Sequence, residues 1–325
     1  MSLPATRKSE SRLSIDRIAA AVDSIDAVFL NSPQFESDAL SVELGMRVVL
    51  KVETVNPIRS FKGRGAEFFI SQLGDDSRQL VCASAGNFGQ GLAFAARKRG
   101  IGLVVYAAEN ANAAKVARMR QLGAEVRLFG PDFDAAKRKA GEFANEAGAH
   151  FVVDGLEPAV SEGAGTIAIE WCRWPTPFDF ALVPLGDGAL LAGIATWMKA
   201  HSPATRMIGV CAAGSPAMEL SWRSRELRST ESANTIADGI ATREPVPEAL
   251  ADLRNVVDEI LLVDDHAIIK AMQMSFRLHG FVVEPAGAAG LAAAFTHNDK
   301  FRNANVVVPL TGGNMTPEQI RKWLS

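Results

Sequence analysis

The stretch "FALVPLGDGALLAGIATWM", residues 180–198, decides the fold class. It begins with an apolar run, "FALVPL", of the kind found in strands that are buried on both faces. Glycines follow and then a second apolar run, which predicts a strand, a turn and a helix in succession. A membrane span would place the Asp187 carboxylate deep in lipid, where it is costly without a partner. The stretch therefore predicts a buried unit of an α/β protein.

The same alternation continues along the chain. Eight further runs predict strands: "RVVLKVE", "QLVCAS", "GLVVYA", "EVRLF", "HFVVD", "RMIGVCA", "EILLV" and "NVVVPL". Helix-like segments such as "GQGLAFAARKRG" lie between them and end at a glycine. Alternating strands and helices indicate an α/β fold with mostly parallel, twisted sheets. Because nine strands are many for one such sheet, we expect two α/β domains.

Composition excludes several classes of function. The chain has 325 residues, 48% of them hydrophobic and 22% charged, as in soluble globular proteins. A net charge of −3 offers no basic surface to a nucleic acid, and we expect no membrane partner. Cys82, Cys172 and Cys211 are far apart, which favours a reducing compartment. The N-terminus lacks the apolar core of a signal peptide, so we expect a cytoplasmic protein whose first dozen residues form a tail.

Three glycine-rich junctions follow predicted strands, where ligands of α/β proteins bind. The first is "ASAGNFGQG", residues 83–91, whose small residues leave backbone N–H groups free at a positive helix end. Such an end suits a carboxylate or a phosphate, although a tight turn with an N-cap explains the segment equally well.

The second junction is "PLGDGALLAG", residues 184–193, which predicts a phosphate-binding turn. A dinucleotide site is disfavoured because the glycine spacing differs from GxGxxG and the next strand ends without an acidic residue. The third is "VVVPLTGGNM", residues 306–315, where the hydroxyl of Thr311 is available to a ligand. Its alternative is a turn before a C-terminal helix that is capped by Thr316.

Lys62 lies in "SFKGRGA", residues 60–66, on the apolar face of an expected helix, which charged side chains usually avoid. With Ser60 as N-cap, Lys62 is at the positive end of the helix dipole, and Arg64 adds a second positive charge. We expect these effects to favour the neutral, nucleophilic amine, which carbonyl ligands trap as a Schiff base. The alternative is a lysine whose stem packs on the core while its head reaches solvent.

A reactive amine, a phosphate turn and a carboxylate loop together suit pyridoxal 5'-phosphate, which has an aldehyde, a phosphate and a heteroaromatic nitrogen. Six segments carry a resemblance to one family: "KVETVNPIRSFKGRGA", "ASAGNFGQG", "PLGDGALLAGI", "TIADGIA", "VVEPAGAAGLAA" and "LTGGN". In this order they resemble the threonine dehydratase and serine racemase family of fold-type II pyridoxal-phosphate-dependent enzymes. The resemblance extends from about "IAAAVDSI" to the C-terminus.

The resemblance implies a tryptophan synthase β-like fold in which residues 1–79 and 156–325 form a large cofactor domain and residues 80–155 a small closing domain. Lys62 would hold the cofactor and later remove the substrate α-proton. The remaining cofactor-binding residues would be Phe61, Asn87, Gly186, Asp187, Gly188, Ala189, Leu190, Glu284 and Thr311. The substrate carboxylate would be held by Ser84, Ala85, Asn87 and Phe88.

Five positions depart from the family pattern. Racemases of the family have a serine at Ala85, and a histidine is usual at Phe88. Asp187 and Ala189 replace glycines of the phosphate turn, and Cys211 stands where some members have an acidic residue that binds a cation. These departures argue against racemisation and predict no metal site.

The resemblance implies an ammonia-lyase, or dehydratase, that eliminates the β-hydroxyl of a small amino acid and gives a 2-oxo acid and ammonia. L-Threonine and L-serine are the default substrates, phenylserine and hydroxyaspartate are further candidates, and a homodimer or homotetramer is expected. The alternatives are a threonine synthase or β-replacement enzyme on the same fold, a non-catalytic pyridoxal-phosphate-binding protein, and a nucleotide-binding α/β protein.

Overall fold

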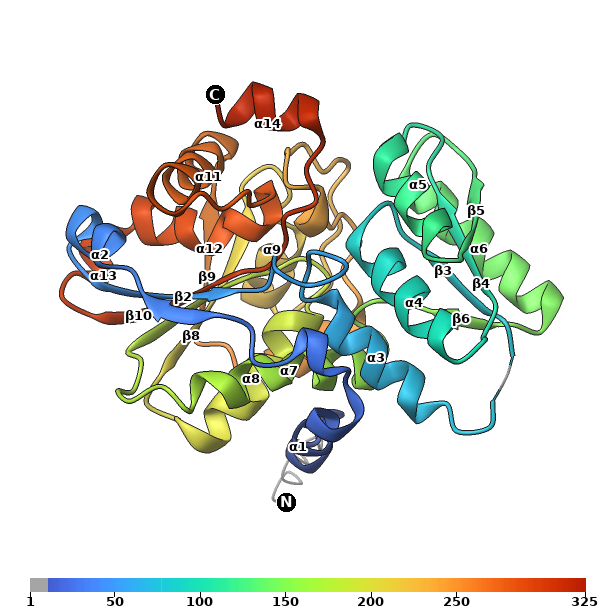
Figure 1. Ribbon diagram of the computed structural model, residues 1–325, viewed down its shortest axis with the longest axis horizontal. Coiled ribbons are helices and arrows are strands. Elements are labelled where there is room, and N and C mark those ends of the chain that lie inside the picture. The colour runs from blue at the N-terminus through green and yellow to red at the C-terminus, as the bar shows by residue number, and fades with distance from the viewer. Residues whose placement is uncertain (1–10, 77) are drawn as a thin grey trace, which may run out of the picture.

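The computed structural model describes residues 11–76 and 78–325 of the chain. Its ten strands are β1 (Gln34–Glu36), β2 (Arg47–Val52), β3 (Leu80–Ala83), β4 (Leu103–Ala107), β5 (Glu125–Leu128), β6 (His150–Val152), β7 (Phe180–Pro184), β8 (Arg206–Ala212), β9 (Glu259–Val263) and β10 (Asn305–Leu310). They form two sheets, and helices cover both faces of each (Figure 1). The predicted α/β fold with two mostly parallel sheets is confirmed.

Fourteen α-helices occur in the described residues. They are α1 (Ile15–Ser24), α2 (Asp38–Leu44), α3 (Lys62–Gln72), α4 (Asn87–Lys98), α5 (Ala113–Gln121), α6 (Phe133–Ala147), α7 (Pro158–Trp171), α8 (Ala189–His201), α9 (Ala217–Ser224), α10 (Pro247–Leu253), α11 (Asp265–His279), α12 (Pro285–Thr296), α13 (Asn298–Phe301) and α14 (Pro317–Trp323). None of these described helices combines the length and the apolar character that crossing a membrane requires.

The larger sheet has the order β1-β2-β10-β7-β8-β9, and every neighbouring pair except β1 and β2 is parallel. All nine predicted strands are present. The tenth, β1, was missed because its three half-buried residues at the sheet edge are too few to show a period.

Side chains of the larger sheet are buried on both of its faces. Val48 and Leu50 of β2 belong to a core with α11 and α12, whereas Val49 between them belongs to a core with α7 and α8. A strand with a helix layer on each face must be apolar at every position. This explains the continuous apolar runs that identify the strands in the sequence.

The smaller sheet has the order β5-β4-β3-β6 and is parallel throughout, and its strands lie within residues 80–152. Its cores contain residues of α4 and α5 on one face and of α6 on the other, and Figure 1 shows this part beside the larger sheet. Helix α3 lies between the two parts and packs against both α4 and α7.

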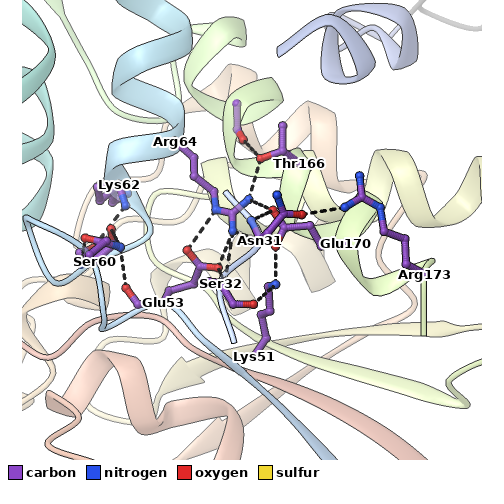
Figure 2. Close-up of polar contacts among 12 residues, drawn as sticks. Asn31, Ser32, Lys51, Glu53, Ser60, Lys62, Arg64, Thr166, Glu170 and Arg173 are labelled. Carbon is purple, nitrogen blue, oxygen red and sulfur yellow. Dashed lines mark hydrogen bonds and ion pairs between the residues drawn. The ribbon is translucent and has the colours of Figure 1, made fainter. Parts of the chain in front are cut away.

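A group of buried charges, the Arg64 cluster, fixes α3 to the larger sheet (Figure 2). It consists of Arg64, Glu53, Glu170 and Lys51. The Arg64 side chain is fully buried, and its nitrogens lie 2.8 Å from Glu53 Oε1 and 2.6 Å from Glu170 Oε1. Lys51 pairs with the other oxygen of Glu170. Each buried charge therefore has a partner of opposite sign, which burial requires.

The chain termini give two further results. Residues 1–10 of the expected N-terminal tail lie outside the described residues, whereas Arg12 pairs with Asp252 of α10 at 2.7 Å. At the other end, Thr316 caps α14 as predicted, and its backbone N–H donates a reciprocal hydrogen bond to the side-chain oxygen of Gln319.

We predict that Arg64→Leu lowers the free energy of unfolding by about 3–5 kcal/mol, because Glu53 then loses its ion pair with Arg64 and Glu170 keeps only its pair with Lys51. Urea denaturation followed by circular dichroism measures the loss. Arg277→Leu is the control, because it breaks an exposed pair with Glu43 and should cost less than about 1 kcal/mol. Equal costs for the two variants would contradict this role of the cluster.

Candidate cofactor and active site

A cavity of about 620 Å³ opens between the two parts of the molecule, where strands of both sheets end. This volume is in the usual range for sites of small molecules. All thirteen predicted site residues line it: Phe61, Lys62, Ser84, Ala85, Asn87, Phe88, Gly186, Asp187, Gly188, Ala189, Leu190, Glu284 and Thr311. The fold thus brings together residues up to 250 positions apart, although their individual roles stay predictions.

Lys62 is the first residue of α3, and its amine forms an ion pair with Asp154, which follows β6. The two side chains are only 16% and 12% exposed. The amine also lies 4.6 Å from the ring centroid of Phe61 and 5.9 Å from that of Phe88. The head of Lys62 therefore points into the cavity and not into solvent.

Two expectations about the surroundings of Lys62 were wrong. The helix begins at Lys62 with Phe61 as N-cap, and Ser60 instead accepts a long 3.4 Å hydrogen bond from the Lys62 backbone N–H. The charge of Arg64 is neutralised by Glu53 and Glu170 on the far side of the helix (Figure 2). Asp154, which sequence reasoning missed, is the charged group in contact with the amine.

The loop of Ser84–Phe88 joins β3 to α4, and the hydroxyl of Ser84 holds it in shape. That hydroxyl accepts hydrogen bonds from the backbone N–H groups of Gly86 at 3.1 Å and of Gly89 at 3.0 Å. Ala85 and Phe88 line the cavity beside it. Ser84 thus orders the positive end of α4, where the carboxylate pocket was predicted.

Asn87 and Glu284 are joined across the cavity floor. The amide nitrogen of Asn87 donates to Glu284 Oε1 at 2.5 Å, and its oxygen accepts from Asn314 at 2.8 Å. Gly312 permits this approach, because a Cβ there would lie 2.1 Å from Glu284 Oε1. Asn314 was not among the predicted site residues, although it stands in the "TGGN" segment.

Burial raises the pKa of Glu284 to about 7, and the nearby charge of Lys115 offsets only part of this effect. The side chain is 3% exposed, and its second oxygen is buried without a hydrogen-bond partner in the described part of the chain. Glu284 is therefore able to hold or release a proton near neutral pH.

The turn of Gly186–Leu190 follows β7 and begins α8, so its N–H groups are at a positive helix end that suits a phosphate. Gly188 has φ +101°, which favours glycine. The Asp187 carboxylate accepts a 2.9 Å hydrogen bond from the Thr242 hydroxyl. Burial raises the pKa of Asp187, and the charge of Asp154 raises it further.

Charged side chains from both parts of the molecule meet at the cavity. Lys115 of α5 lies 2.5 Å from Asp238, and Arg243 pairs with Asp134 of α6. None of the four was among the predicted site residues, although Asp238 stands in the "TIADGIA" segment. The pairing of each residue depends on a partner that is distant in the sequence.

These features define a protein that can bind an aldehyde cofactor through a lysine. An amine beside an aromatic ring and a helix end that suits an anion share one cavity with Glu284 and Asp154. Each of these two side chains has a buried oxygen without a hydrogen-bond partner in the described part of the chain. These features fit a flat aromatic aldehyde with a phosphate group, held by a lysine Schiff base.

Comparison with known proteins leads to the same kind of cofactor. Residues 25–312 match the family described as pyridoxal-phosphate dependent enzyme. The chain belongs to this family, and pyridoxal 5'-phosphate is its cofactor.

Relatives and solved structures are similar over most of the chain. The chloroplastic biosynthetic threonine dehydratase of Arabidopsis thaliana is 35% identical over 90% of this chain and 50% of its own length. The L-threonine ammonia-lyase of Thermotoga maritima is 33% identical over 89% of this chain and 72% of its own. The structure of maize serine racemase has a TM-score of 0.89 at 27% identity and covers 95% of this chain and 96% of its own. The chain thus spans half of the Arabidopsis protein.

We predict that Glu284→Gln changes how stability depends on pH in the cofactor-free protein. Between pH 4.5, the ordinary pKa, and about 7, native Glu284 keeps a proton that the unfolded chain has released, so wild-type stability falls as pH rises. Glutamine removes this fall, and the stability difference, variant minus wild type, should grow by about 3 kcal/mol across the interval.

Urea unfolding at several pH values measures the difference. Glu109→Gln, at an exposed position, is the control and should show no such trend. A difference that stays constant with pH would contradict the raised pKa of Glu284.

Proposed function

We propose that the protein is a pyridoxal-phosphate-dependent ammonia-lyase that acts on L-threonine or L-serine and releases ammonia and a 2-oxo acid. One observation carries the proposal: the Lys62 amine, the loop at the start of α4 and the turn at the start of α8 open into the same cavity. The names of the similar proteins from Arabidopsis thaliana and Thermotoga maritima support the reaction class.

Each predicted residue has a task in this proposal. Backbone N–H groups of residues 186–190 hold the phosphate, and those of residues 84–88 hold the substrate carboxylate. Phe61 packs against the cofactor ring, and Asn87 and Glu284 bind its polar edge. The bonded pair of Asn87 and Glu284 supports the last assignment, because it presents an amide and a carboxyl group together.

Pyridoxal phosphate, when bound, would supply an electron-withdrawing ring that makes the α-proton of an amino acid more acidic. The Lys62 amine accepts the α-proton, and the β-hydroxyl leaves as water once it has gained a proton. The unsaturated amine that is released takes up water, loses ammonia and becomes the 2-oxo acid. Thr311 offers the ring nitrogen a neutral hydroxyl, which suits prompt elimination better than a charged partner would.

The same proposal argues against racemisation. Ala85 lines the cavity and has no hydroxyl that could return a proton to the opposite face of the α-carbon. The domain boundaries at residues 79/80 and 155/156, the cytoplasmic location and the homodimer or homotetramer stay predictions.

We predict that Lys62→Ala loses both the visible absorption of bound cofactor and all formation of 2-oxo acid, because in this proposal the Lys62 amine forms the Schiff base with the cofactor and accepts the α-proton. An absorbance scan and a 2-oxo acid assay on purified protein measure the two losses. Lys199→Ala is the control, because Lys199 pairs with Asp258 outside the cavity and should keep both signals. A Lys62→Ala variant that retained band and turnover would end the proposal.

We also predict that threonine and serine give 2-oxo acid, whereas phosphohomoserine releases no phosphate. A panel that adds phenylserine and hydroxyaspartate tests how Phe88 shapes the substrate pocket. Phosphate release without 2-oxo acid would identify a threonine synthase instead, and cofactor binding without any turnover would indicate a non-catalytic protein.

A further inference from the structure

We propose that Asp154 is a positioning residue that holds the Lys62 amine, as the ammonium ion, whenever this amine is not joined to the cofactor. The inference rests on the proposed function. It assigns a task to a residue that no motif in the sequence marks.

The contact itself is the first argument. Asp154 Oδ2 forms an ion pair with the Lys62 amine. Lys62 has no other ion pair among the described residues. The other oxygen, Oδ1, is buried and has no hydrogen-bond partner among the described residues. The rings of Phe61 and Phe88 flank the amine. Little water surrounds the pair, and its attraction is stronger than on an open surface.

The carboxylate is held in a fixed place by its neighbours. Gly155 lies against the phosphate turn, where a Cβ would be 2.6 Å from the Asp187 carbonyl oxygen. Arg12 donates to the carbonyl oxygens of Leu156 at 2.8 Å and Gly155 at 3.3 Å. The segment after Asp154 is therefore tied to two separate parts of the chain, and its position does not depend on the Lys62 contact.

The contact has two opposite consequences. When the amine takes the α-proton it becomes positive, and an adjacent carboxylate stabilises that product. The same carboxylate opposes attachment of the cofactor at low pH, because only the neutral amine adds to the aldehyde carbon, with loss of one water. A residue with a purely structural task would affect stability, but it would not both favour proton transfer to the amine and hinder attachment of the cofactor at low pH.

Other titratable groups lie near the pair of Lys62 and Asp154, but none of them forms an ion pair with the Lys62 amine in the described part of the chain. Asp187 interacts with both Asp154 and Lys62, and its own pKa is raised by burial. Lys137 acts on Asp187 from α6. The pKa of Cys82 on β3 is raised by burial and by the charge of Asp154, so its thiol stays protonated in the working range. Asp154 is therefore the charge whose removal changes the state of Lys62 most directly.

The test measures cofactor attachment without any amino acid. Cofactor-free wild type and Asp154→Asn are mixed with pyridoxal phosphate at a series of pH values, and the rate at which the visible band appears is recorded. We expect the pH midpoint of this rate to fall by on the order of one unit in Asp154→Asn. With substrate, kcat should fall roughly 10- to 100-fold while KM changes less than about threefold.

Asp132→Asn is the matched control. Asp132 lines the same cavity and caps α6, a task that asparagine also performs, so the midpoint should stay at the wild-type value. An unchanged midpoint in Asp154→Asn, or a kcat within twofold of wild type, would overturn the inference. If Asp154→Asn does not fold, Asp154→Glu is used, and a midpoint displaced downward there would overturn it as well.

Failure of the proposed function gives a different result. In that case the midpoint still moves, because attachment needs no substrate, but no amino acid in the panel is converted. If Lys62→Ala still shows the visible band, the assignment of Lys62 fails, and with it both proposals.

Discussion

The fully buried guanidinium of Arg64 is the constraint on which the position of the site depends (Figure 2). A charge without access to water is tolerated only where paired groups surround it, and Arg64 has Glu53 from the end of β2 and Glu170 from α7. These partners raise the pKa of Arg64 despite its burial. Because the first turn of α3 is tied in this way to two elements of the larger part, Lys62, two residues earlier, has little freedom to leave the cavity.

The same geometry separates two neighbouring cations. Arg64 and Lys62 lie in one helical turn, yet each meets its own carboxylates, on opposite sides of α3. A carboxylate close to each cation shortens the range of that cation's electric field. The electrostatic environment of the Lys62 amine is therefore determined by Asp154 and by the rings of Phe61 and Phe88. The chemistry of the amine is in this way set locally, inside the cavity, while the Arg64 cluster contributes the placement.

Much of the fold could be predicted from the sequence, because strands buried on both faces are apolar at every position and glycines mark the turns that follow them. The same turns identify the cavity lining, since parallel strands end on one side of a sheet. Asp154 and Glu170 could not be predicted: they lie 92 positions from Lys62 and 106 positions from Arg64, respectively, and an isolated acidic residue has no periodic signal. The prediction of Ser60 as the N-cap of α3 was wrong for a local reason. Ser60 pairs with Gly312 in an isolated β-bridge, and Phe61 occupies the N-cap position instead.

Asp187 shows how the site accommodates an acidic residue in a turn that suits a phosphate. Two negative groups repel each other strongly in a partly dry cavity. The Asp187 side chain, however, turns to the Thr242 hydroxyl, and burial together with Asp154 raises its pKa, which favours the uncharged carboxyl group. A dianionic phosphate on the same turn acts in the same direction. An uncharged Asp187 leaves the backbone N–H groups and the positive end of α8 as the dominant field at the turn, so the departure from glycine is compatible with phosphate binding.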